Sequence, residues 1–262
     1  MGNAKKIFAS RVKSANVKIF PEAALGYLIG PVLALAANGI VNTYLIQYWD
    51  KVLSLGEWAP LFQTLLPIIS AIIIVIGNLL VGRLMSRKPG FAGKARPLIL
   101  IGMPFIAIAL LVLFMVPFPE GATAENPSIL ALVMITIGYN LYYAVAYPFY
   151  YTAHSSLVGL STRDGKKRSL LATASNAAQL GASGLAGMIG PFLVDWLDLL
   201  AKDGSLEAKQ AANNKWFILM IIMIACLVIG CFVEFLFTRE RITEESLQKM
   251  GDKVAAKAQK LD

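Results

Sequence analysis

The chain has 262 residues, of which 57% are hydrophobic and 15% are charged, and its formal net charge is +8. Soluble domains carry about 25% charged residues. The lower charge and the long apolar blocks exclude a soluble globular protein and predict an integral membrane protein. Because the positive charges cluster at the ends of the apolar blocks, where membrane topology accounts for them, we expect no nucleic-acid partner.

Six stretches are apolar and long enough to cross a bilayer, which takes about 20 residues. They are residues 25–48, 61–84, 97–116, 129–151, 170–193 and 216–237. We therefore expect an all-α membrane fold with a six-helix bundle at residues 23–238. A cytoplasmic lead-in at residues 1–22 precedes it, and a charged amphipathic tail or linker at residues 239–262 follows it.

The distribution of positive charge predicts the topology. Twenty of the 24 lysine and arginine residues fall in the N-terminal segment, the second and fourth loops and the tail, and four fall in the remaining loops. Short basic loops stay on the cytoplasmic side. We therefore expect a multi-pass protein of the cytoplasmic (inner) membrane with both termini in the cytoplasm.

The polar side chains inside the spans are nearly all neutral. Such groups face a cavity or another helix, because lipid cannot hydrogen-bond them. Tyr139, Tyr143 and Tyr147 share one face of the fourth span, and both a cavity wall and helix packing remain open for them. The candidate solute-binding residues are Asn38, Asn42, Asn78, Tyr143, Tyr147, Asn176 and Gln179.

Several other residues carry narrower expectations. Glycines in the fifth span predict close helix packing; they are Gly181, Gly184, Gly187 and Gly190. Glu234 precedes Arg239 by five residues, which favours a structural ion pair at the cytoplasmic end. His154, the only histidine, is expected to be solvated or to cap a helix. The sequence contains no phosphate-binding glycine loop, metal-ligand spacing or activated nucleophile, so we expect no enzyme, catalytic residue, metal or cofactor.

Four motifs follow one another along the chain. They are Gly82–Pro97, which ends Gly93-Lys94-Ala95-Arg96-Pro97, then Tyr147-Pro148-Phe149-Tyr150, Thr162–Arg168 and Thr238-Arg239-Glu240-Arg241. In this order they resemble the glycoside–pentoside–hexuronide:cation symporters, the major facilitator family that includes melibiose permease. The resemblance implies one six-helix half of a major facilitator fold, built as a 3+3 repeat. It also implies a conformational role for the basic loop, through Gly82, Arg87, Lys94 and Arg96.

The charges that this family uses are missing from the chain. Alignment on the motifs places the family's acids of the first, second and fourth helices at Leu35, Ile74, Asn78 and Ala146. The family's fifth-helix arginine falls on Asn176. Without a carboxylate, this site cannot bind Na⁺ or carry a proton in the family's manner, whereas its amides suit a neutral polar solute.

The sequence contains one six-helix block, and alternating access in these folds uses two. We expect half of a secondary transporter for a small polar, sugar-like solute, completed in the lipid bilayer by a second copy or by a separate chain carrying the other half. The alternative is a transporter-derived structural or scaffold subunit that does not transport. A channel has less support, because the sequence has no ring of charges and no filter-like loop.

Overall fold

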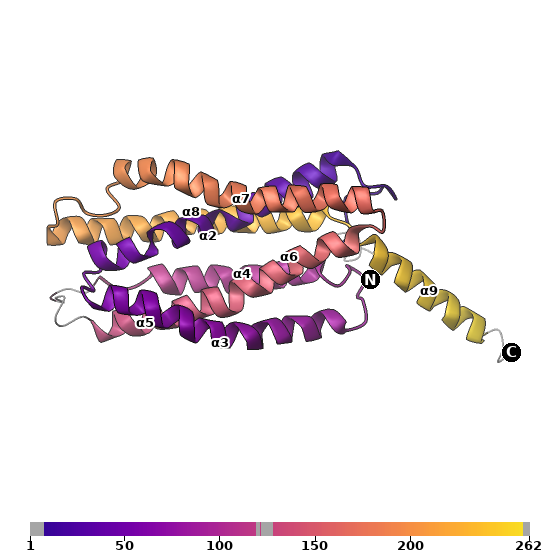
Figure 1. Cartoon of the computed structure of the whole chain (residues 1–262), viewed down its shortest axis with the longest axis horizontal. Helices are drawn as coiled ribbons and strands as arrows, with labels where there is room; N and C mark the ends of the chain where they lie inside the picture. Colours follow the sequence, from indigo (N-terminus) through magenta and orange to yellow (C-terminus); the bar gives the residue numbers. More distant parts are fainter. Residues whose placement is uncertain (1–7, 119–120, 122–127, 259–262) are drawn as a thin grey trace.

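The computed structural model describes residues 8–118, 121 and 128–258, and it is built from helices (Figure 1). Six helical segments in this part of the chain are long and apolar enough to cross a membrane, which confirms the predicted spans. They are Ile19–Val52, Trp58–Ser86, Arg96–Phe114, Ile129–Ser161, Gly165–Trp196 and Leu206–Phe237. Residues 1–7 of the predicted lead-in and 259–262 of the predicted tail lie outside the described residues.

Two of the spans are composite. The first consists of η1 (Ile19–Ile29), α2 (Gly30–Gln47) and η2 (Tyr48–Val52), and the fourth of α5 (Ile129–Asn140), η3 (Leu141–Ala146) and α6 (Tyr147–Ser161), where η marks wider, π-helical turns. The other helices are α3 (Trp58–Ser86), α4 (Arg96–Phe114), α7 (Gly165–Trp196), α8 (Leu206–Phe237) and α9 (Arg241–Ala258).

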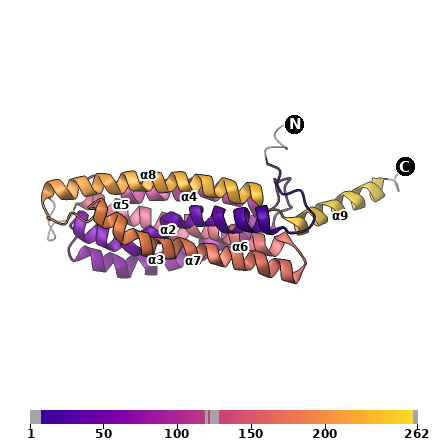
Figure 2. The ribbon, with the colours of Figure 1, turned by 90° about the horizontal axis from the view of Figure 1, so that it is seen from above.

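The bundle has two long sides. Seen from above, α4 and α8 run along one side and α3 and α7 along the other (Figure 2). Helix α2 packs against both α7 and α8, while α6 packs against α4, α3 and α7. The arrangement leaves much of α3 and α7 uncovered. Only 17% of the residues in the most apolar 18-residue stretch of α3, and 28% of those in the corresponding stretch of α7, are buried.

Small residues allow the closest helix contacts. A Cβ added at Gly39 of α2 would lie 2.6 Å from the carbonyl oxygen of Ala182 on α7. This approach is the packing that small residues provide between membrane helices. By contrast, Gly184 and Gly187 of α7 have nothing within 4 Å of an added Cβ, so this part of the predicted glycine stripe faces outward.

The charged segments meet at one end of the bundle, from which α9 projects (Figures 1 and 2). The guanidinium of Arg239 donates to the carbonyl oxygens of Lys13 and Ser14, and Arg163 pairs with Glu245 at 2.9 Å. The segment before η1, the loop after α6 and the start of α9 are therefore held together at this end.

Candidate functional site

A continuous strip of tyrosines runs along the fourth span. The rings of Tyr139 and Tyr143 lie 4.5 Å apart, Tyr143 and Tyr142 lie 4.9 Å apart, and Tyr142 and Tyr147 lie 6.3 Å apart. Tyr147 in turn stacks on Tyr151, with centroids 5.7 Å apart and planes 14° from parallel. We call these five residues the tyrosine strip.

Amide side chains from the neighbouring helices bond to this strip. The Tyr143 hydroxyl donates to Oδ1 of Asn42 at 2.5 Å, and the Tyr142 hydroxyl donates to Oδ1 of Asn38 at 3.3 Å. Further along the strip, the Tyr151 hydroxyl donates to Oε1 of Gln179 at 3.4 Å. The structure therefore brings five of the seven predicted residues to one aromatic and polar surface, namely Asn38, Asn42, Tyr143, Tyr147 and Gln179.

The remaining two predicted residues lie apart from this surface. Asn78 of α3 is exposed and accepts a bond from Thr152 of α6 at 3.3 Å. Asn176 of α7 is exposed and makes no side-chain hydrogen bond within the described residues. The predicted set thus comprises a connected core and two outlying amides.

A cavity of about 200 Å³ lies at the start of the strip. It is lined by Val41, Asn42, Leu45, Ile46, Trp49, Gln63, Pro67, Tyr139 and Tyr143. Trp49 is 1% exposed, and its Nε1 is the one buried side-chain N or O atom without a partner in the described part of the chain. A buried donor without a partner is costly, so Trp49 brings to the cavity wall a residue whose indole N–H is unsatisfied.

Sequence reasoning missed Trp49 and Tyr142 as site residues. Trp49 lies in the sequence Tyr48-Trp49-Asp50 at the end of the first span. A tryptophan at the end of a membrane helix usually anchors the helix at the membrane–water interface. Tyr142 stood one residue away from the i, i+4 stripe. The π-helical turns of η3 change the angular spacing, and the rings of Tyr142 and Tyr147 therefore come together.

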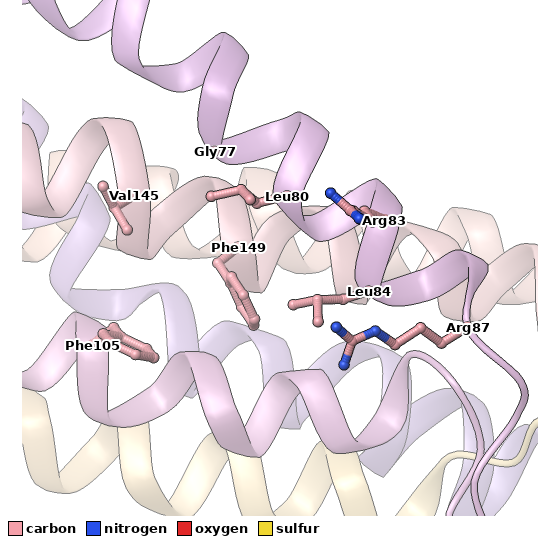
Figure 3. Close-up of a pocket in the computed structure, with 8 residues that line it drawn as sticks. All are labelled: Gly77, Leu80, Arg83, Leu84, Arg87, Phe105, Val145 and Phe149. Carbon is pink, nitrogen blue, oxygen red and sulfur yellow. The ribbon is translucent and has the colours of Figure 1, made fainter.

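A larger groove of about 370 Å³ lies between α3, α4 and the fourth span. Figure 3 shows Arg83 and Arg87 at one end of a wall that is otherwise apolar, with Leu80, Phe105 and Phe149. Its lining has no neutral hydrogen-bonding side chain. Since a polar solute needs such groups for orientation, we assign the candidate site to the smaller cavity rather than to this groove.

The predicted conformational loop is anchored to the start of α9. The Glu240 carboxylate accepts three backbone N–H groups, from Lys94 at 2.8 Å, Ala95 at 2.9 Å and Arg96 at 2.8 Å. The Arg96 side chain is buried, donates to the carbonyl oxygen of Phe235 at 2.7 Å, and lies over the Phe235 ring. Of the other predicted loop residues, Arg87 lines the large groove, and Gly82 has no neighbour within 4 Å of an added Cβ.

The predicted ion pair between Glu234 and Arg239 is wrong. Arg239 binds Glu244 through Nη2 at 2.7 Å, and this hydrogen bond raises the pKa of Arg239. The Glu234 carboxylate is buried inside the bundle, where it accepts a hydrogen bond from the Tyr150 hydroxyl, whereas Arg239 lies beyond the end of α8 at Phe237.

The prediction that His154 is solvated or caps a helix is also wrong. The imidazole is 0% exposed, and its Nδ1 lies 2.6 Å from Oε1 of Glu234. His154 lies more than one turn before the end of α6, on the face that packs toward α7 and α8. It is therefore a bundle residue and not a surface residue.

Comparison with protein families gives one match. A family model described as MFS/sugar transport protein matches residues 26–260. No curated protein matches the chain. The matched range includes the tyrosine strip, the cavity and the anchored loop.

Proposed function

The chain belongs to the MFS/sugar transport protein family, and from this premise we propose that it is one half of a secondary transporter for a neutral, sugar-like solute. Six membrane-spanning helices and the family membership make it an integral, multi-pass membrane protein of transporter type. The location of the solute site, the presence of a second half and the orientation of the chain in the membrane are proposed below.

The observation that carries the proposal is the cavity at the start of the tyrosine strip. It combines aromatic rings with neutral donors and acceptors, namely the Asn42 amide, the Gln63 amide and the unpartnered Trp49 indole. Sugars present apolar ring faces together with hydroxyl groups, so stacking and hydrogen bonding act on the same ligand. Since the lining contains no charge, a neutral solute fits it better than an ion does.

The cavity volume supports a second half. Pockets for small ligands usually measure about 300–1,000 Å³, and this cavity measures about 200 Å³. The exposed amides Asn42, Asn78 and Asn176 lie within the spans. Asn42 and Asn78 each accept one hydrogen bond, but lipid offers no partner for the N–H groups of the three amides. A second six-helix half over the α3 and α7 side would cover them and enlarge the site. That half would come from a second copy, a separate chain or the same polypeptide.

The orientation follows from the charge distribution. We place the chain in the inner membrane, with both termini and the anchored loop on the cytoplasmic side. These segments carry most of the lysines and arginines, and short basic loops stay in the cytoplasm. The six helices are arranged as two groups of three in this proposal, as the repeat of major facilitator folds requires.

One observation favours the alternative of a scaffold subunit. Leu35 and Ala146, the positions where the resembling family has acids, are buried in the core at 3% and 0% exposure. In this second reading the helices form a packed structural unit whose α3 and α7 side is sealed against another membrane protein.

The test is uptake of radiolabelled neutral mono- and disaccharides into proteoliposomes that contain the complex extracted in mild detergent. We expect saturable uptake that falls in Asn42→Ala and is retained in Thr64→Ala, an exposed hydroxyl on α3 outside the cavity that bonds only its own helix. A complex with unrelated membrane proteins and no uptake of any sugar would support the scaffold instead.

A further inference from the structure

The groove of about 370 Å³ between α3, α4 and the fourth span results from the way these helices pack. Both α3 and α4 lie on the fourth span rather than closely against each other, so the space between them is open above Val145 and Phe149. Gly77 lets α3 approach the fourth span, since a Cβ added there would lie 2.8 Å from the carbonyl oxygen of Ala144. The fourth span is therefore the floor of the groove, and α3 and α4 are its walls.

The walls of the groove are apolar and reach the outer surface of the bundle. Leu80 of α3 is 57% exposed and Phe105 of α4 is 42% exposed, although both line the groove. Exposed apolar side chains on a membrane span face the acyl chains of the bilayer, and an acyl chain is as apolar as a leucine side chain. The surrounding lipid therefore supplies a ligand of the same chemistry as these walls.

Two arginines lie at one end of the groove. Figure 3 shows Arg83 and Arg87 there, with the Arg87 side chain extending toward Leu84. Both arginines are exposed, and neither guanidinium has a hydrogen-bond or ion-pair partner within the described residues. They are four residues apart at the end of α3, where like charges repel each other. An anion bound between them would relieve this repulsion.

The sequence around the two arginines contains no acid. Residues 82–97 include five lysines and arginines and neither aspartate nor glutamate. Four carboxylates at the charged end of the bundle are already engaged by other groups; they are Glu22, Glu240, Glu244 and Glu245. The two cations at the groove therefore remain available to an external anion.

We propose that the groove binds one anionic phospholipid. Its acyl chain lies along Leu80, Phe105 and Phe149, and its phosphate lies at the two arginines. A guanidinium group pairs with phosphate oxygens through two parallel hydrogen bonds, and basic pockets between membrane helices bind anionic head groups. A head group with a net negative charge fits better than a zwitterionic one, because the lining holds two cations and no carboxylate.

The position of the groove favours a lipid over a second protein half as its occupant. Helix α4 runs along the side of the bundle opposite α3 and α7 (Figure 2), and the groove opens between α3 and α4. A second half over the α3 and α7 side leaves this flank in contact with the bilayer. The lipid site rests on the embedding of the chain in a membrane and not on transport.

The test is native mass spectrometry of the full chain in detergent, titrated with phosphatidylglycerol and with phosphatidylcholine of the same acyl chains. We expect tighter binding of phosphatidylglycerol. Each basic side chain near the membrane surface contributes about fivefold in affinity for anionic lipid, so Arg83→Gln combined with Arg87→Gln should weaken this binding about thirtyfold. Arg87→Gln alone should weaken it about fivefold, which keeps the test valid if the double variant fails to fold.

The matched control is Lys88→Gln combined with Lys166→Gln, which removes two exposed cations from the same end and leaves the groove lining intact. We expect this control to bind phosphatidylglycerol nearly as tightly as the unmodified protein. Phe105→Ala removes part of the α4 wall and should weaken the binding severalfold with both arginines in place. An equal loss in the lysine control would overturn the site, as would equal binding of the two lipids or unchanged binding in Phe105→Ala.

Two further measurements separate the lipid from other occupants. Inorganic phosphate should not displace phosphatidylglycerol, because it lacks an acyl chain, and displacement would assign the arginines to a free anion instead. The same titration on the complex extracted in mild detergent should retain the lipid site. Loss of the site in that complex would assign the groove to an interface with another protein and overturn the proposal.

Discussion

The charged end of the bundle and the tyrosine strip use polar groups in opposite ways. At the charged end, Glu240 accepts four hydrogen bonds and Arg241 forms a bidentate pair with the fully buried Glu22. Along the strip, Asn42 accepts one bond from Tyr143, remains exposed, and lines the same cavity as Trp49, whose indole N–H has no partner in the described residues. Polar groups whose hydrogen bonds are satisfied within the protein stabilise the fold. Polar groups with unused hydrogen-bonding capacity can bind a ligand.

The largest expected effect comes from breaking the saturated region. Arg241→Ala leaves the Glu22 carboxylate buried without its cation, which costs about 3–5 kcal/mol in proteins. We expect a loss of this size in the free energy of unfolding, measured by denaturant titration in detergent. The matched control is Arg163→Ala, whose ion pair with Glu245 is exposed and contributes about 0–1 kcal/mol. Equal losses in the two variants would contradict the distinction between buried and exposed pairs.

A smaller effect is expected where α2 and α7 touch. Gly39→Ala places a Cβ against the backbone of Ala182, and overpacking of this kind costs about 1–3 kcal/mol. Gly187→Ala on α7 meets open space, so the better helix propensity of alanine should leave stability unchanged or raise it by up to about 1 kcal/mol. Thermal unfolding of the two variants, side by side, measures the difference. A loss at Gly187 as large as that at Gly39 would show that the outward glycines are packed against a partner.

The cavity at the start of the tyrosine strip should respond more in binding than in stability. Trp49→Phe keeps an aromatic ring and removes the indole N–H, which has no partner to lose. Because the smaller ring leaves a void at a fully buried position, we expect a modest loss of unfolding free energy, together with a fall in solute affinity of about tenfold, which corresponds to about 1.4 kcal/mol. Equilibrium binding of the sugar that the uptake assay identifies measures this change. Unchanged affinity together with raised stability would mean that the N–H is an internal defect and not a ligand donor.

The fold was more predictable from the sequence than the site. A helix that crosses the lipid must be apolar over about 20 residues whatever its neighbours are, so such spans can be predicted from the sequence. All six predicted spans are confirmed. The partners of Glu234 and His154 were not predictable, because they depend on how α6 and α8 rotate against each other. The role of Glu240 had a signal in the Thr238–Arg241 motif, but only the fold shows that it caps the loop at Lys94.

The smallest effect should come from the outlying amide of the predicted set. Asn176 is exposed on α7, makes no side-chain bond within the described residues, and lies outside the cavity lining. Asn176→Ala should therefore leave the unfolding free energy within about 0.5 kcal/mol, as exposed substitutions usually do. In the isolated chain, we expect the affinity for solute to stay the same as well. In the assembled transporter, a second half that covers α7 would place Asn176 against either its surface or the solute. A loss of uptake in the complex, without a loss of binding by the isolated chain, would assign Asn176 to the interface between the halves.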